Sequence, residues 1–106
     1  MSDCILIYVT VGSEDEAETI ARQLVAQRLV ACANLLPVMR SFYRWEGAVE
    51  SGREVVLLLK TQRDRFEAVR AQIRSLHSYK LPCIVAVDIT TGDADFLQWV
   101  AAESTP

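Results

Sequence analysis

Two long extended segments meet at a two-residue turn in the middle of this 106-residue chain, and they constrain its fold more than any other feature. Residues 31–45 and 48–60 both have strand-like sequences, and Glu46-Gly47 between them is typical of a hairpin loop in which glycine supplies a positive φ. Strands of this length reach roughly 45 Å at about 3.3 Å per residue. A compact chain of this size is about 33 Å across. The hairpin is therefore predicted to extend beyond its own domain.

Two details refine this hairpin. Ser51-Gly52 predicts a β-bulge in the second strand, or else the turn itself, which would make the hairpin shorter. Pro37 has no N–H group, so the first strand is predicted to lie at a sheet edge or to carry a bulge. An edge strand has unpaired backbone groups that favour pairing with another chain.

The segments around the hairpin alternate between strand and helix patterns. The apolar runs 4–11 and 83–89 predict buried strands. Ser13 and Glu16 form a capping-box pattern, and the apolar spacing after them predicts a helix that runs to about Arg28.

A second helix is predicted from the T-x-x-D cap at Thr61 to about His77, and Asp93 is predicted to cap a short final helix. The order β-α-β-β-α-β plus a terminal helix indicates a ferredoxin-like α+β fold, with a long central hairpin, as one domain of residues 1–106. The first and third strands are expected in the centre of the sheet.

Composition excludes some classes of partner. The net charge is −3 and no basic stripe is present, so nucleic acid is not an expected partner. No apolar run approaches the roughly 20 residues of a membrane helix. The segment Met1-Ser2-Asp3 has no basic region of a signal peptide, so a cytoplasmic location is expected. Cys4, Cys32 and Cys83 are expected to be reduced, packed thiols.

Large apolar side chains gather near the predicted hairpin tip. A monomer would expose Phe42, Tyr43, Trp45 and Val49, and an exposed aromatic patch of this kind usually marks an interaction surface. A closed homo-oligomer would cover this patch and the edge strand together. The alternative is a bent hairpin that folds its aromatic side chains onto its own helices.

Five short motifs are spread along nearly the whole chain. They are ACAN at 31–34, Tyr43-x-Trp45-Glu46-Gly47, Leu59-Lys60-Thr61, His77-x-Tyr79-x-x-Pro82, and Gly92-Asp93 with Phe96 and Trp99. In these motifs the chain resembles the CutA family, the divalent-cation tolerance proteins. The resemblance implies a homotrimer with hairpins in contact between subunits, a link to tolerance of copper and other divalent cations, and no catalytic reaction. The trimer resembles that of PII signalling proteins in architecture alone.

The resemblance also implies three metal ligands: a Cys in the first strand, the His, and a Glu just after the Pro. The matching positions here are Val9, His77 and Cys83, so two of the three differ. His77 and Cys83 remain the candidate ligands for copper or another divalent cation, and no cofactor is required. In the alternative interpretation Cys83 packs as a small apolar residue, and His77 bonds the last carbonyls of its helix.

A second candidate site is a cleft between subunits. Lys60 ends an apolar strand, and with Trp45, His77 and Tyr79 it is a candidate to line a cleft that binds a small anion. Alternatively, Lys60 forms a structural salt bridge, while Trp45 and Tyr79 only anchor an interface.

We therefore expect a non-enzymatic homotrimer linked to divalent-cation tolerance, with a PII-like anion sensor as the alternative. An acylphosphatase-like enzyme is disfavoured because residues 12–16, Gly-Ser-Glu-Asp-Glu, cannot form a basic anion cradle. A scaffold that presents its surface to another protein is a further alternative.

Overall fold

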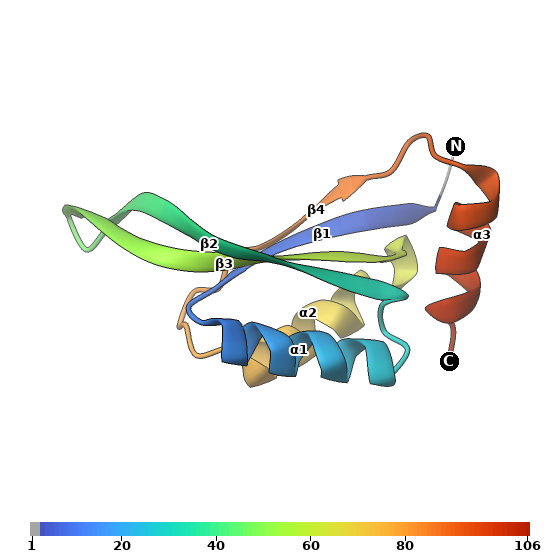
Figure 1. The fold of residues 1–106 in the computed structure, drawn as a ribbon, viewed down its shortest axis with the longest axis horizontal. Helices are drawn as coiled ribbons and strands as arrows, with labels where there is room; N and C mark the ends of the chain where they lie inside the picture. Colours follow the sequence, from blue (N-terminus) through green and yellow to red (C-terminus); the bar gives the residue numbers. More distant parts are fainter. Residues whose placement is uncertain (1–2) are drawn as a thin grey trace.

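Two helices cover one face of a four-stranded antiparallel sheet, and the other face is open (Figure 1). This computed structural model describes residues 3–106. Met1 and Ser2, which entered the expectation of a cytoplasmic chain, lie outside the described residues. Across residues 3–106, no helix is long and apolar enough to cross a membrane.

The order of elements is that of a ferredoxin-like α+β fold with an added C-terminal helix. The elements are β1 (Cys4–Val11), α1 (Glu14–Ala26), β2 (Cys32–Trp45), β3 (Ala48–Gln62), the 3-10 turn η1 (Arg63–Arg65), α2 (Phe66–Leu76), β4 (Ile84–Asp88) and α3 (Ala94–Glu103). The strand order is β2-β3-β1-β4. The prediction that the first and third strands are central is confirmed.

The core lies between the sheet and helices α1 and α2. Alternate side chains of a strand point to the same face, and in β1 and β3 every second residue is apolar on the helical side. These side chains pack with the apolar stripes of the two helices. The buried set includes Ile7, Val9, Ile20, Leu24, Leu57, Leu59, Val69 and Ile73.

The hairpin makes the molecule elongated, with principal dimensions of 44 × 25 × 23 Å. Its tip projects well beyond α1 and α2 (Figure 1). Glu46 and Gly47 form the turn with φ values of 50° and 84°. A two-residue turn with both central residues at positive φ matches the twist of the flanking strands. The predicted turn is confirmed, and the alternative turn at Ser51-Gly52 is wrong.

A β-bulge lies in β2 rather than in β3. The register shifts between Leu36 and Met39, which pair with Val56 and Glu54, so Pro37 and Val38 together face one residue. The predicted bulge at Ser51-Gly52 is wrong, because that dipeptide pairs regularly with β2. The prediction for Pro37 is confirmed in both forms, since β2 is an edge strand and is bulged there. A missing N–H costs no ladder bond at such a position.

Helix boundaries differ from the sequence expectation in two places. Helix α1 ends at Ala26, two residues before Arg28, which adopts a left-handed φ of 59°. The predicted cap at Thr61 is wrong, because β3 continues to Gln62 and α2 begins only at Phe66. The Thr61 side chain is buried and donates a 2.7 Å hydrogen bond to the Leu29 carbonyl. Its hydroxyl thus joins β3 to the α1–β2 connection.

The caps at Ser13 and Asp93 are confirmed. Ser13 Oγ accepts the Glu16 N–H at 3.2 Å, and Asp93 Oδ2 accepts the Phe96 N–H at 3.0 Å. Each oxygen satisfies one of the free N–H groups of a first helical turn.

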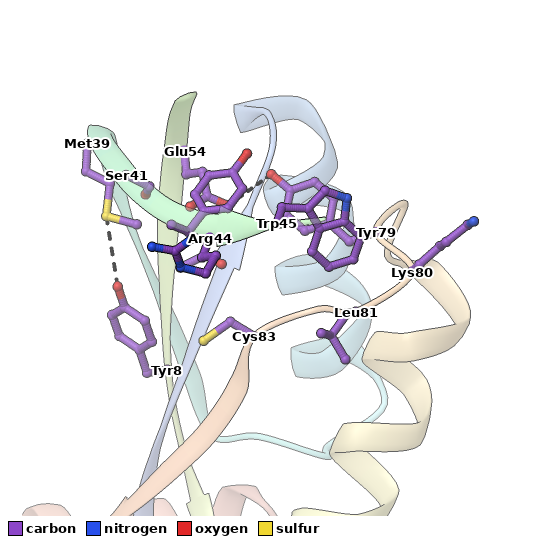
Figure 2. Close-up of a pocket in the computed structure, with 12 residues that line it drawn as sticks. Tyr8, Met39, Ser41, Arg44, Trp45, Glu54, Tyr79, Lys80, Leu81 and Cys83 are labelled. Atoms are coloured by element: carbon purple, nitrogen blue, oxygen red, sulfur yellow. Dashed lines mark hydrogen bonds between the residues drawn. The ribbon is translucent and has the colours of Figure 1, made fainter. Parts of the chain in front are cut away.

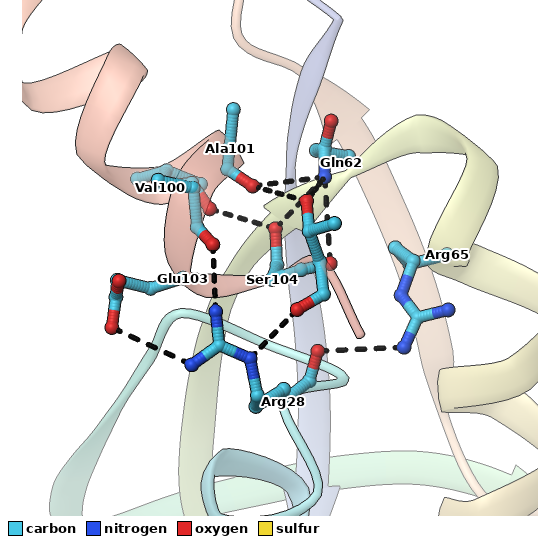
Figure 3. A network of polar contacts seen from close by, with 9 residues as sticks. Arg28, Gln62, Arg65, Val100, Ala101, Glu103 and Ser104 are labelled. Carbon is cyan, nitrogen blue, oxygen red and sulfur yellow. Dashed lines mark hydrogen bonds and ion pairs between the residues drawn. The ribbon is translucent and has the colours of Figure 1, made fainter.

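Helix α3 is held at the end of the sheet far from the hairpin tip (Figure 1). The Arg28 guanidinium donates to the carbonyls of Ala102 and Thr105 at 2.8 and 2.7 Å (Figure 3). Gln62 donates to the Ala101 carbonyl at 3.1 Å (Figure 3). These donors satisfy two carbonyls of the last turn of α3, which lack backbone partners there, and one carbonyl just after the helix.

We expect Thr61→Val to lower the free energy of unfolding by about 1–2 kcal/mol, because the partly buried Leu29 carbonyl loses its donor while the side-chain shape is kept. Urea denaturation measures the change. Thr19→Val is the matched control: Thr19 is exposed on α1, and its replacement should change stability by less than about 0.5 kcal/mol. Equal effects of the two variants would contradict the structural role of the Thr61 bond.

Candidate functional site

The open face of the sheet carries a distinct set of side chains near the hairpin. The register and the alternation of strand residues place Tyr8 and Thr10 of β1, and Glu54 of β3, on the face opposite the helices. Beyond the bulge, the alternation of β2 also turns its odd-numbered residues to this face. They are Met39, Ser41, Tyr43 and Trp45.

These side chains border a cavity of about 570 Å³ (Figure 2). The sheet forms its floor, and the connection from α2 to β4 forms its wall through Tyr79, Lys80, Leu81 and Cys83. Arg44 is even-numbered and pairs with Val49 on the other side of the hairpin, yet it also lines the cavity. Volumes of about 300–1,000 Å³ are typical of small-molecule sites. The cavity is therefore the candidate functional site.

His77 anchors the wall from behind. Its side chain is fully buried, and its Nε2 lies 2.8 Å from the Thr10 carbonyl. A carbonyl only accepts, so Nε2 carries the proton and Nδ1 is free to accept the Tyr79 N–H at 3.1 Å. Both ring nitrogens are thus used in joining the wall to β1. The alternative in which the ring bonds carbonyls of its own helix is wrong.

The same wall is joined to the start of α1. Glu16 Oε2 accepts hydrogen bonds from the backbone N–H and the hydroxyl of Ser78, both at 3.2 Å. It also lies 3.5 Å from His77 Nδ1. Glu16 therefore completes only half of the expected capping box, because its carboxylate bonds the wall instead of the Ser13 N–H.

Tyr79 connects the wall to the hairpin. Its hydroxyl donates a 2.9 Å hydrogen bond to Glu54 Oε2 (Figure 2), and its ring centroid lies 4.7 Å from that of His77. A Cβ at Gly12 would stand 3.2 Å from the Tyr79 hydroxyl oxygen, so glycine there leaves room for the ring. Burial, and then the bond to Glu54, raises the pKa of Tyr79 to about 12.

Trp45 and Tyr79, two of the four residues predicted to line an inter-subunit cleft, share this cavity within one protomer. His77 is buried behind it, and Lys60 lies elsewhere on the sheet with its Nζ 2.6 Å from Asn34 Oδ1. Among residues 3–106 Lys60 forms no salt bridge, so that alternative is wrong within the protomer. The cleft between subunits stays a prediction.

The four apolar residues predicted at an interface do not form one surface. Phe42 and Val49 lie on the face of the hairpin opposite to Tyr43 and Trp45, because their positions alternate along the strands. Phe42 and Val49 are 65% and 67% exposed, whereas Tyr43 and Trp45 border the cavity. The alternative in which a bent hairpin covers them all is wrong within the protomer. Their role in an interface stays a prediction.

A metal ion does not fit the donors that one protomer brings together. Within the described residues 3–106, no group of three or more His, Cys, Asp and Glu side chains is placed to hold one. The ring nitrogens of His77 are both hydrogen-bonded. Cys4 is buried, and Cys32 and Cys83 are free thiols that are half-buried. Cys83 lines the cavity. Metal binding by His77 and Cys83 stays a prediction, because it would need further donors from outside one protomer.

Glu54 and Glu16 are site residues that the sequence alone did not reveal. Glu54 stands immediately before the apolar run 55–59 and faces the cavity. A carboxylate next to such a run is a weak sequence signal of a functional site. The sequence pattern places Glu16 in a helix cap alone. No local pattern predicts its contact with Ser78, which is 62 residues away in the chain.

Comparisons with known proteins agree with each other. A family model described as CutA1 divalent ion tolerance protein matches residues 5–103. The divalent-cation tolerance protein CutA of Archaeoglobus fulgidus is 42% identical over 94 residues, which cover 89% of this chain and 91% of that protein.

Two solved structures are similar to this chain along nearly their whole length. The structure of CutA from Xylella fastidiosa has a TM-score of 0.95 at 38% identity, and the match covers 98% of this chain and 100% of that one. The structure from Archaeoglobus fulgidus, described as a periplasmic divalent cation tolerance protein, has a TM-score of 0.93 at 37% identity, with 96% and 99% covered.

The raised pKa of Tyr79 predicts an alkaline loss of stability. Tyr79 holds its proton more firmly in the folded chain, with a pKa of about 12 against 10.0 ordinarily, so this contribution is complete below pH 10 and disappears as the pH rises to 12. Tyrosinate absorbance should show a late-ionising fraction that Tyr79→Phe removes. Glu54→Gln should lower the pKa of Tyr79, because it removes the carboxylate. An unchanged titration in Tyr79→Phe would contradict the assignment.

Proposed function

The chain belongs to the CutA1 family of divalent ion tolerance proteins, and from this premise we propose that it acts in divalent-cation tolerance as a non-enzymatic homotrimer. The observation that carries the proposal is a sheet covered by helices on one face only, with a hairpin whose tip projects beyond those helices. Both features leave apolar surface that one copy of the chain does not cover.

Exposed apolar groups on the open face support assembly. Leu36, Val85 and Val87 are 47%, 52% and 61% exposed, on the face that no helix covers (Figure 1). Strands β2 and β4 each have one unpaired edge. A closed homo-oligomer covers such faces and edges together, and three copies is the number that the family resemblance implies.

The arrangement of His77 supports a function without catalysis. It is the one histidine of the chain, and both of its ring nitrogens are bonded to backbone groups. A general base needs a free nitrogen within reach of the proton that it removes. In this protomer His77 instead fixes the position of Tyr79.

A bound copper ion, if it takes part in tolerance, would need donors from more than one subunit. Cys83 is a soft thiol ligand suited to copper, and it lines the cavity. His77 would have to release at least one hydrogen bond to join it. We keep His77 and Cys83 as the proposed ligands on that condition. The cytoplasm is the proposed location, because the free thiols of Cys32 and Cys83 suit a reducing compartment.

A PII-like sensor of a small anion is the second candidate function. The observation that favours it is the cavity shared by Trp45 and Tyr79, which are two of the residues expected at the cleft. In this alternative Lys60 of the same or another subunit supplies the positive charge.

Light scattering after size-exclusion chromatography should give three times the protomer mass of 11.9 kDa. Phe42→Ala should weaken association by roughly 30-fold, because an aromatic anchor buried in an interface contributes about 2 kcal/mol or more, and Phe42 lies on the hairpin face away from the cavity. Val25→Ala is the control, since Val25 is also an exposed apolar residue but lies on α1 in the helical layer. A mass near one protomer would refute the trimer.

Copper and small anions should separate the two functions by their effect on the melting temperature. Under the first proposal, Cu²⁺ raises it in the parent and in Cys32→Ser, but not in Cys83→Ser or His77→Ala. Cys32 is the control because it is also free and half-buried. Stabilisation by citrate or nucleotides without any effect of Cu²⁺ would instead support the sensor and end the metal-site proposal.

A further inference from the structure

The cavity contains a carboxylate without a cationic partner. Glu54 is half-buried, accepts one hydrogen bond from Tyr79, and forms no ion pair with any of residues 3–106. Tyr43 and Trp45 line the same cavity (Figure 2). Aromatic faces attract cations, and the attraction grows when water is excluded. This part of the cavity therefore suits an ammonium group.

The cavity also contains a cation that no carboxylate neutralises. Arg44 lines it, is exposed, and makes no ion pair within the described part of the chain. The ammonium group of Lys80 points away from the cavity (Figure 2), so Arg44 is the basic group that serves it. A guanidinium binds a carboxylate through two parallel hydrogen bonds.

The remaining walls are apolar. Leu81 and Met39 line the cavity together with the aromatic rings. A purely anionic ligand would put negative charge beside Glu54, and a purely cationic one would leave Arg44 without a partner. A molecule with an ammonium group, a carboxylate and an apolar body satisfies all three parts.

We propose that this cavity binds a small zwitterion of the α-amino acid class, with its ammonium group at Glu54 among the aromatic rings and its carboxylate at Arg44. The site goes beyond the proposed function, because every group that it uses belongs to one protomer. The volume of about 570 Å³ accommodates an amino acid with a large apolar side chain.

Three matched ligands test the proposal: L-phenylalanine, L-phenylalaninamide and N-acetyl-L-phenylalanine. They share one aromatic body, and the second and third lack the negative and the positive charge respectively. The Trp99→Phe variant leaves Trp45 as the only indole, so its fluorescence reports the cavity. We expect saturable binding of phenylalanine, and at least tenfold weaker binding of the other two, because each charged hydrogen bond is worth about that factor.

Two substitutions in the Trp99→Phe background assign each charge to its partner. Glu54→Gln should bind phenylalanine and N-acetyl-phenylalanine about equally, because the ammonium group no longer gains from the carboxylate. Arg44→Gln should bind phenylalanine and its amide about equally. The controls are Glu67→Gln and Arg53→Gln, which remove exposed charges that do not line the cavity and should leave all three affinities unchanged.

Absent or unsaturable binding, equal affinities for the three ligands, or preferences that persist in both variants would overturn the proposal. Light scattering on each sample gives its mass, which shows whether a change in phenylalanine binding is accompanied by a change in oligomeric state. If Glu54→Gln dissociates an oligomer and phenylalanine does not bind, a basic side chain of a second copy occupies the cavity instead, and the proposal is wrong. A monomeric parent that binds phenylalanine would refute the trimer alone.

Discussion

The bulge at Pro37 and Val38 is the constraint on which the arrangement of the hairpin depends. One extra residue in a strand reverses which side chains face each side of the sheet from that point onward. Before the bulge Leu36 points to the open face, and after it Tyr43 and Trp45 do. An unbulged β2 would put Phe42 on this face and remove both rings from the cavity. A proline without an N–H group thus determines, across several residues, what the cavity is made of.

The wall opposite the hairpin depends on His77. The wall residues 79–83 form no helix or strand, and backbone outside regular structure needs other partners for its polar groups. His77 links this segment to the Thr10 carbonyl of β1, and Glu16 links it to α1 through Ser78. The cavity is therefore bordered by groups with several fixed attachments. Such attachments limit the ordering that a ligand must impose, which favours binding.

Local patterns in the sequence predicted the strands, the two-residue turn and the caps at Ser13 and Asp93, since each depends on residues only a few positions apart. They failed where two local signals competed. Gly52 and Pro37 both indicate a bulge, and only the pairing of the two strands decides between them. They also could not give contacts between distant segments, such as that of Tyr79 with Glu54, 25 residues earlier. The candidate ligand cleft was therefore predicted only in part.

The two faces of the hairpin tip separate two roles that the sequence placed on one patch. Phe42 and Val49 do not line the cavity and are the more exposed pair, so contact with another chain would remove their apolar surface from water. Tyr43 and Trp45 lie beside a carboxylate and a guanidinium that are not paired with each other. An apolar interface gains little from such charges, because unpaired charges are costly to bury. The two proposals therefore place protein contact on one face of the hairpin and small-molecule contact on the other.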